Sequence, residues 1–360
     1  MTKKKPSDRN LFVLAIILTV LGLIAVADAS APQAIQAFSD KYYYVKQQLW
    51  WALAGIVGMV ILANIPYKLW EKLAVPIFAV GTFLLGLVLI PGVASQILGA
   101  RRWIHLGPAT IQPSELIKLA LAIYLAKVSA KKKSMLAYLI PLFVVCGLIM
   151  LEPDLGTTMI IAVMGLSQIF LSEINFFKFA LTIVGAGAAS FLLIITSEYR
   201  RSRLMTFLQK SSDPLGKDYH IRQILLGLGS GGFWGVGLGQ SRQKFLFLPE
   251  SATDSILAVI AEEVGFIGAL VLIILFGLFI YKGLIIAKNA PDKFGQILAI
   301  GITTWIGGQM LLNAAAITAL LPLTGVPLPF FSYGGSSLVT VLAATGILLN
   351  ISKVGHGKKS

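Results

Sequence analysis

Long apolar stretches, separated by short polar segments, run along almost the whole chain. Most of them approach the roughly 20 residues that a helix needs to cross the hydrocarbon core of a bilayer. The pattern therefore predicts an all-α polytopic membrane protein, with a single integral membrane domain over residues 1–360. The ten predicted transmembrane helices cover residues 11–30, 48–65, 73–91, 113–127, 137–151, 157–172, 177–196, 254–280, 294–321 and 335–352.

Composition indicates the same class, because 56% of the residues are hydrophobic and only 13% are charged, far from the balance of a soluble domain. The first stretch follows a basic tail and ends in small residues at 27–31, as a cleavable signal peptide does. Its length is nearer to that of a membrane span than to that of a signal core. We therefore expect a retained first helix.

Lysine and arginine are unevenly distributed between alternate loops, and cytoplasmic loops carry the excess in membrane proteins. With the N-terminus in the cytoplasm, the cytoplasmic segments hold 17 Lys and Arg residues and the short external loops hold 4. We expect cytoplasmic tails at 1–10 and 353–360, and a large extracytoplasmic loop at 197–253 between the seventh and eighth helices. The net charge of +14 then reflects a multi-pass topology in the cytoplasmic membrane, among membrane lipids, and gives no reason to expect nucleic acid as a partner.

In this orientation, nearly all of the unusual polar sequence faces away from the cytoplasm. The candidate binding residues are the cations, acids and hydroxyls of that face. They are Arg101 and Arg102 in the loop 92–112, Glu115 and Lys118 in the fourth span, Glu152 and Asp154 between the fifth and sixth spans, Arg242 and Lys244 in the large loop, and Ser332 and Ser336 before the tenth span. The sequence therefore predicts an extracytoplasmic site.

The segment 229–268 is the most informative part of the chain. A glycine-rich turn and two basic residues lead to Asp254, Glu262 and Glu263, which lie at the mouth of the eighth span. Acids there are costly to place and indicate a functional site. The structural alternative is a capping box, with Ser251 as the N-cap and Asp254 at the third helical position. Helical spacing places Glu262 nearer to the Asp254 face and makes Glu263 the better candidate for a packing partner.

Several other polar groups have two interpretations. Glu115 and Lys118 are three residues apart, so they could form an ion pair inside the fourth span, or Glu115 could only complement the helix dipole. The external basic residues could anchor lipid headgroups or together bind a pyrophosphate. A divalent cation, Mg or Mn, could bind to Asp254 or to Glu152 and Asp154. The three histidines do not have the spacing of metal ligands, so the sequence does not establish a metal site.

Several motifs, in order along most of the chain, resemble the SEDS family of bacterial cell-wall polymerases, which is the FtsW and RodA group. The matching segments are 99–107 (GARRWIHLG), 112–118 (QPSELIK), 151–158 (LEPDLGTT), 229–239, 248–250 with Thr253 and Asp254, and 324–337. The segments 241–244 and 261–268 are more similar to the division-type FtsW branch than to the elongation-type RodA branch.

The resemblance implies a peptidoglycan glycosyltransferase that polymerises lipid II into β-1,4 glycan strands on the outer face of the membrane, for cell division or elongation. The substrates would be lipid II and an undecaprenyl-pyrophosphoryl glycan. The partners would be a class B penicillin-binding protein that acts as a transpeptidase, and other division or elongation complex proteins. The essential acid of the family falls on Asp254, which would act as the catalytic general base. Ala252 and Ser255 stand where the family often has His and Phe, so a His–Asp pair is not expected here.

Two other functions fit the same sequence. A lipid II flippase could use buried charges such as Glu115, Lys118 and Glu262 as a path. It should then place polar groups at every depth, whereas the inner halves of these spans are almost uniformly apolar. A non-catalytic division scaffold that recruits a transpeptidase would present the same surface without needing Asp254. We therefore expect the polymerase function.

Overall fold

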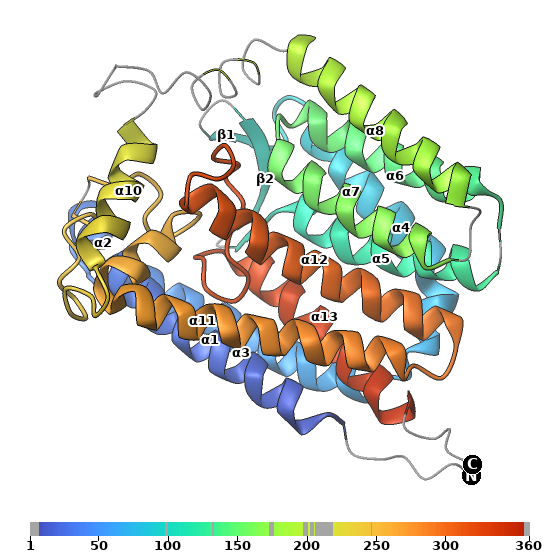
Figure 1. The fold of residues 1–360 in the computed structure, drawn as a ribbon, viewed down its shortest axis with the longest axis horizontal. Coiled ribbons are helices and arrows are strands. Elements are labelled where there is room, and N and C mark those ends of the chain that lie inside the picture. Colours follow the sequence, from blue (N-terminus) through green and yellow to red (C-terminus); the bar gives the residue numbers. More distant parts are fainter. Residues whose placement is uncertain are drawn as a thin grey trace.

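Helices form most of the computed structural model, which describes residues 7–97, 100–107, 109–131, 133–172, 176–196, 201, 205, 219–245 and 247–355 (Figure 1). The long helices are α1 (Arg9–Ala29), α3 (Tyr43–Asn64), α4 (Lys68–Val88), α5 (Pro113–Ala130), α6 (Met135–Leu151), α7 (Leu155–Phe170), α8 (Phe176–Thr196), α11 (Ile256–Lys288), α12 (Lys293–Ile317) and α13 (Gly335–Gly355). Each coincides with one predicted span, so the all-α membrane fold is confirmed.

Six of the described helices are individually long and apolar enough to cross a membrane, namely α1, α3, α4, α11, α12 and α13. Helices α6 and α7 and the segment Phe176–Ala188 of α8 are shorter apolar helices. Helix α5 has 18 residues and includes Glu115, Lys118 and Lys127. The count of ten spans and the orientation remain predictions.

The structure adds short elements that the hydrophobic pattern did not predict. Helices α2 (Ala31–Phe38) and α10 (Tyr219–Gly231) lie outside the ten spans. The loop 92–112 contains strands β1 (Ser95–Ile97), β2 (Ala100–Leu106) and β3 (Ala109–Ile111), which form an antiparallel sheet in the order β1-β2-β3. Strands this short give only a few alternating positions, too few to be distinguished from a loop.

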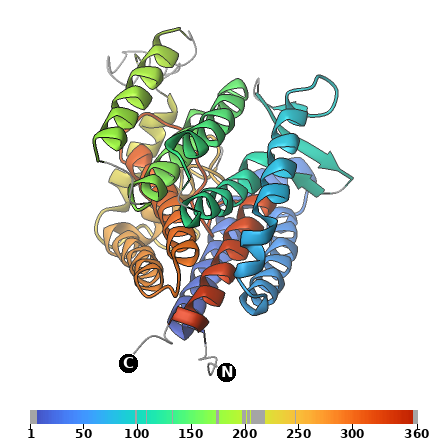
Figure 2. The same cartoon turned by 90° about the vertical axis from the view of Figure 1, so that its right-hand side faces the viewer.

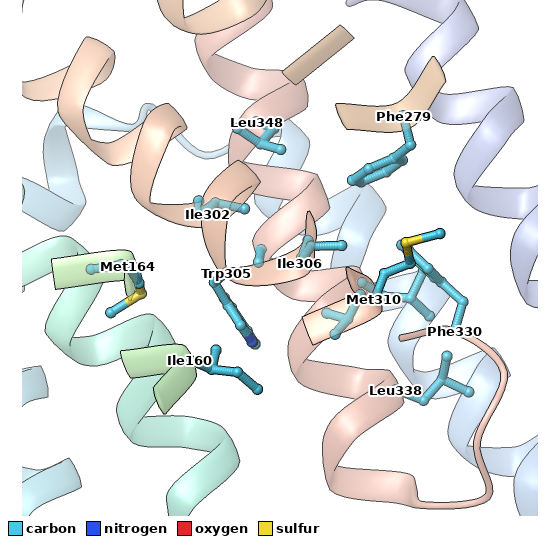
Figure 3. Close-up of a cluster of buried hydrophobic side chains, with 14 of the residues drawn as sticks. Ile160, Met164, Phe279, Ile302, Trp305, Ile306, Met310, Phe330, Leu338 and Leu348 are labelled. Atoms are coloured by element: carbon cyan, nitrogen blue, oxygen red, sulfur yellow. The ribbon is translucent and has the colours of Figure 1, made fainter. Parts of the chain in front are cut away.

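The apolar core is centred on α12, most of which is buried. Figure 3 shows Trp305 and Ile306 of α12 between Ile160 of α7 on one side and Phe330, from the loop before α13, on the other. All four side chains are at most 3% exposed. In contrast, α3 and α4 present many apolar side chains outward, as lipid-facing helices do.

The two ends of the helical bundle differ in character. The start of α1 lies beside the end of α13, because the Asp8 N–H donates to the Ser352 hydroxyl (3.0 Å). Helix α10 and the small sheet lie toward the opposite end (Figures 1 and 2). The predicted arrangement, with both termini on one side and the polar loops on the other, matches this geometry.

Candidate active site

Asp254 lies in a turn that immediately precedes α11, and its side chain is half-buried. The helix begins at Ile256 with Ser255 as its N-cap residue, and no side-chain capping hydrogen bond is made there. The predicted capping box is therefore wrong. Ser251 is buried and its hydroxyl donates to the carbonyl of Ala29 (3.4 Å) instead. Asp254, Glu262 and Glu263 consequently do not share one helix.

The loop before α13, residues 318–334, holds the backbone of this turn in place, and we call it the clamping loop. The Tyr333 N–H donates to the carbonyl of Ala252 (2.8 Å), and the Ser332 hydroxyl donates a short hydrogen bond to the carbonyl of Thr253. The side-chain amide of Asn313, from α12, donates to the carbonyl of Asp254 (2.8 Å). Three consecutive carbonyls are thus fixed from outside, and their preference for these donors explains why the helix does not extend to residue 251.

Ser332 and Asn313 also organise the clamping loop. The Ser332 hydroxyl accepts from the N–H of Leu328 (2.7 Å), and the Asn313 amide donates to the carbonyl of Val326 (2.8 Å). These contacts give Ser332 a structural role. Its part in substrate binding stays a prediction. The sequence analysis missed Asn313, since an isolated amide inside an apolar span carries no motif.

The Asp254 carboxylate faces a glycine of the clamping loop. A Cβ atom built on Gly325 would lie 3.7 Å from Oδ2 of Asp254, while Oδ1 accepts from the Thr253 hydroxyl (3.4 Å). The neighbours of Gly325 pack closely on Gly156, near the start of α7. The same short loop therefore joins Asp254 to the segment that carries Glu152 and Asp154.

Arg102, Glu152 and Asp154 form a cluster between β2 and the start of α7. The Arg102 guanidinium donates to the carbonyls of Glu152 (3.0 Å) and Pro153 (2.7 Å), and lies 3.9 Å from the Asp154 carboxylate. Asp154 caps α7 by accepting from the N–H and hydroxyl of Thr157 (3.0 and 2.9 Å). The three predicted residues are thus brought together by the tertiary structure.

Glu152 is the least satisfied member of this cluster. It is 1% exposed, and neither of its carboxylate oxygens has a hydrogen-bond partner among the described residues. Burial, together with the nearby charge of Asp154, raises the pKa of Glu152 to about 8, against the opposing effect of Arg102. Burial without a hydrogen-bond partner therefore favours the protonated form of Glu152.

The predicted ion pair between Glu115 and Lys118 is confirmed. The Lys118 ammonium lies 2.8 Å from the Glu115 carboxylate, and both residues are 1% exposed. The ammonium also donates to Oε1 of Gln309 (2.9 Å), which accepts in addition from the Trp305 indole (2.9 Å). The amide of Gln309 donates to the carbonyl of Pro327 (2.8 Å), so this buried network ends in the loop that clamps Asp254.

Lys244 is almost fully buried and links the segment before α11 to both α1 and α11. Its ammonium contacts the carboxylates of Asp28 in α1 (2.6 Å) and Glu263 in α11 (2.8 Å). Burial lowers the pKa of Lys244, but the hydrogen bonds to the two acids outweigh it and hold the pKa above its ordinary value. The prediction that Glu263 is a packing partner fits this bridge. Pyrophosphate binding by Lys244 stays a prediction, and its contacts favour a structural role.

Glu262 is also used to hold the large loop. Its carboxylate accepts from the Ser241 hydroxyl (2.5 Å), from the Ser230 hydroxyl (3.2 Å) and from the backbone N–H of Arg242 (3.2 Å). The Arg242 side chain is exposed. Of the two predicted basic residues of this loop, Arg242 is thus the one whose charge faces outward.

Two glycines mark the point where the glycine-rich segment crosses α11. Gly235 and Gly265 have φ angles of 82° and 69°, and a Cβ atom on either would collide with backbone atoms of the other segment. In a continuous helix each N–H would donate to the carbonyl four residues earlier in its own segment. At this crossing, four N–H groups donate to carbonyls of the other segment instead. The bonds are Phe266 N–H to Gly232 C=O (2.9 Å), Ile267 N–H to Phe233 C=O (3.2 Å), Val236 N–H to Glu262 C=O (3.0 Å) and Gly237 N–H to Glu263 C=O (3.0 Å). The crossing ties the large loop to α11.

The remaining predicted residues lie around the small sheet. Arg101 is half-buried in β2. The Ser336 hydroxyl accepts from the N–H of Gln112 (3.1 Å) and donates to the carbonyl of Thr110 (3.1 Å), which joins the sheet to the first turn of α13. Within the described residues, no group of three or more His, Cys, Asp or Glu side chains could hold a metal ion. A bound Mg or Mn stays a prediction, as do the substrate-binding roles of Arg101 and Ser336.

Residues 197–200, 202–204, 206–218 and 246 of the predicted loop 197–253 lie outside the described residues. From residue 219 onward, the described part consists of α10, the crossing, and the segment that leads into α11.

Comparison with known proteins gives one consistent result. A family model described as "Cell cycle protein", which covers FtsW, RodA and SpoVE, matches residues 8–356. Stage V sporulation protein E of Bacillus subtilis is 40% identical over 361 residues, covering 98% of each chain. A probable peptidoglycan glycosyltransferase FtsW of Trichlorobacter lovleyi is 40% identical over 357 residues, covering 96% of this chain and 93% of that protein.

Solved structures show the same fold. One comes from a study of the structural coordination of polymerization and crosslinking by a peptidoglycan synthase complex, with a TM-score of 0.78 at 26% identity. The crystal structure of the rod shape determining protein RodA of Thermus thermophilus gives a TM-score of 0.72 at 26% identity. Each alignment covers 97% of this chain and 98% of the other.

Proposed function

The chain belongs to the family of FtsW, RodA and SpoVE cell cycle proteins, and we propose that its peptidoglycan glycosyltransferase activity polymerises lipid II with Asp254 as the general base. Its apolar helices make it a multi-pass protein of the cytoplasmic membrane. We place the reaction on the extracytoplasmic face, because the clamped turn lies at the end of the bundle opposite to the N-terminus of α1 and the C-terminus of α13.

The fixed backbone of residues 252–254 is the observation that carries this proposal. A general base must be held within hydrogen-bond reach of the proton that it removes, and residues locked by their surroundings meet this need best. Here all three carbonyls are hydrogen-bonded, while a glycine faces Oδ2 of Asp254. The backbone of the turn is thus held from outside, and Gly325 packs against the carboxylate side of Asp254.

The proposed step is a single displacement. The acceptor hydroxyl oxygen attacks the anomeric carbon of the donor sugar, and its proton passes to the Asp254 carboxylate. The bond from the anomeric carbon to the phosphate oxygen breaks, and its electron pair leaves with the undecaprenyl pyrophosphate. The new bond is a β-1,4 glycosidic bond.

The leaving pyrophosphate needs cations where negative charge develops. Arg101, Arg102 and Arg242 are the predicted cations that solvent still reaches, whereas Lys118 and Lys244 are almost fully buried and paired with acids. Arg102 already bonds the segment that touches the clamping loop.

We further propose a transpeptidase of the class B penicillin-binding protein type as partner. One structure with the same fold was solved in a study of how a synthase complex coordinates polymerization and crosslinking. Newly made glycan must be crosslinked by a separate activity, so a shared complex would pass the strand directly between the two sites.

The substitution Asp254→Asn tests the proposal. Asn keeps the shape of the side chain but cannot take up the proton, and a positioned base contributes about a hundred- to ten-thousand-fold to the rate. We expect normal expression, nearly unchanged thermal unfolding, retained lipid II binding and a polymerisation rate lowered by at least a hundredfold. Asp292→Asn is the matched control, because Asp292 caps α12 through its oxygen and Asn can do the same. Normal polymerisation by the Asp254→Asn protein would refute the role of Asp254.

A further inference from the structure

A groove lies between α1 and α11 at the end of the bundle where α1 begins. It has a volume of about 330 Å³ and is lined by Arg9, Asn10, Val13 and Leu14 of α1 and by Leu278 and Lys282 of α11. The two helices run side by side (Figure 1), and Lys282 of α11 lies 3.5 Å from the carboxylate of Asp8, just before α1. We call the space between these six lining residues the terminal groove. Asp254 precedes α11 and Lys282 lies near its end, so the groove is separate from the candidate active site.

The lining of the terminal groove changes from charged to apolar along both helices. Arg9 lies one helical turn before Val13, and Lys282 lies one turn after Leu278, so each pair shares one face of its helix. The two cations lie at the same end, because Lys282 pairs with the residue that precedes Arg9. The first predicted span begins at residue 11 and the eighth ends at residue 280. The predicted boundary between headgroups and hydrocarbon therefore passes through the groove.

The charges at the polar end of the groove do not cancel. Asp8 uses Oδ1 to cap α1, where it accepts from two backbone N–H groups (3.0 and 3.1 Å), and turns Oδ2 toward Lys282. Arg9 is exposed and forms no ion pair with any described residue. Two cations against one acid leave a single net positive charge at this end. The apolar end is open to the surroundings, since Val13 is 42% exposed and Leu278 is 46% exposed.

We propose that the terminal groove binds one anionic phospholipid of the leaflet at this end, which is the predicted cytoplasmic leaflet. The phosphate lies between Arg9 and Lys282, and an acyl chain lies along Val13 and Leu278. A phospholipid carries an anion and a hydrocarbon chain in this same order of depth, and basic pockets between transmembrane helices on the cytoplasmic side bind anionic headgroups. This site goes beyond the proposed function and does not depend on it.

The single net positive charge decides which headgroup fits. The headgroup of phosphatidylglycerol carries one negative charge and complements it. In phosphatidylcholine the quaternary ammonium group already neutralises the phosphate, so less electrostatic attraction remains. Free glycerophosphate has the phosphate but no chain to pack against the apolar end. The groove should therefore prefer phosphatidylglycerol to both.

The competing explanation is that Arg9 and Lys282 are ordinary interface cations, which extend toward any anionic headgroup nearby. Lys288, exposed in the last turn of α11, is a cation of that kind and does not line the groove. The Lys282 side chain is only 25% exposed and is held by Asp8 above an apolar wall. The two explanations differ in whether the cations of the groove contribute more to lipid binding than Lys288 does.

The test titrates purified, delipidated full-length protein with phosphatidylglycerol and counts the bound lipids by native mass spectrometry. Phosphatidylcholine and glycerophosphate are titrated in parallel. We expect saturable binding of phosphatidylglycerol, with Lys282→Gln binding about fivefold more weakly, as loss of one basic contact costs. Lys288→Gln is the matched control, with the same change of charge. It lies about 9 Å further along the helix, where salt screens most of its effect, so its affinity should change by less than about twofold.

Asp8→Asn should have the opposite effect, which a loss of folding does not produce. It removes the acid that competes for Lys282, while Asn still caps α1, so phosphatidylglycerol should bind about fivefold more tightly. Asp292→Asn, which changes the capping acid of α12, is its control and should bind as wild type does. Where Lys282→Gln does not fold, Arg9→Gln, at an exposed position, provides the same test.

Three results would each overturn the proposal. Phosphatidylcholine binding as tightly as phosphatidylglycerol would show that the net charge selects no headgroup. Glycerophosphate binding as tightly would show a phosphate site without a chain. Equal losses for Lys282→Gln and Lys288→Gln would show that lipids respond to the charge of the whole surface and not to the terminal groove.

Discussion

At the scale of residues, the candidate site separates groups that hold the backbone from groups that can do chemistry. Ser332 and Asn313 donate hydrogen bonds to the backbone carbonyls of Thr253 and Asp254. Lys118 and Lys244, which the sequence offered as substrate cations, are each paired with buried acids. An unpaired charge in such surroundings would be costly, so each lysine needs its acid partner while it stays buried.

Glu152 should make stability depend on pH. Its pKa rises from 4.5 to about 8 in the folded protein, so the folded state binds more protons than the unfolded state between these values. Stability must then fall as pH rises through this window. Glu152→Gln mimics the protonated acid and removes this contribution, so the variant should become progressively more stable than wild type as pH rises from 4.5 to about 8.

The measurement is thermal unfolding of both proteins in detergent across that window. Glu71→Gln, in the first turn of α4, is the control and should follow the wild-type pH profile. Parallel profiles for Glu152→Gln and wild type would show that Glu152 is not a buried neutral acid.

At the scale of elements, short loops rather than helix faces bring the site together. The loop before α13 contacts the turn at Asp254, receives the side chains of α12, and packs on the start of α7. The crossing at Gly235 and Gly265 replaces helical bonds of α11 by bonds to the large loop. Both connections restrict the helix that follows Asp254, because a displaced segment would leave buried backbone groups without partners.

Glu115 and Lys118 connect α5 to this loop through Gln309, and their removal should be non-additive. Lys118→Met alone leaves the Glu115 carboxylate buried and unpaired, which typically costs about 3–5 kcal/mol. The double variant Lys118→Met with Glu115→Gln leaves no charge, so it should unfold at a higher temperature than Lys118→Met alone. Thermal unfolding and polymerisation rate are both measured. If Lys118→Met and Glu115→Gln instead lower stability and polymerisation rate equally and additively, the two residues have independent roles, such as direct contact of Lys118 with a phosphate.

At the scale of the whole molecule, an outer reaction site requires the predicted orientation. The cytoplasmic segments carry the excess of Lys and Arg, and the ends of α1 and α13 meet at one end of the bundle. A flippase would need a polar path through the full depth, whereas the described buried charges of α5 and α11 pair with partners near the site end. The polymerase reading agrees with this distribution.

Cysteine labelling in intact cells tests the orientation. The native Cys146 is first replaced by Ser, and single cysteines are introduced at Ser134, before α6, and at Ser212, which lies in the loop 197–253 but outside the described residues. A membrane-impermeant thiol reagent should label Ser212→Cys in intact cells and Ser134→Cys only after lysis. The reverse pattern would invert the topology and exclude an outer reaction site.

The sequence was sufficient for features that depend on neighbouring residues. All ten predicted spans contain a helix, because a long apolar segment in lipid must satisfy its own backbone hydrogen bonds wherever it lies in the fold. The pair of Glu115 and Lys118 was predictable for the same reason, since three residues along a helix bring two side chains to one face.

Only the tertiary structure decided which distant residues compete for the same partners. Lys244 is held by Asp28, which lies 216 residues away, and the cap predicted at Ser251 is absent because the loop before α13 takes up the carbonyls of the turn. Gly235 and Gly265 exchange helical bonds only where two segments cross. None of these contacts leaves a periodic signal, because periodicity records the face that a residue occupies and not the segment that it meets.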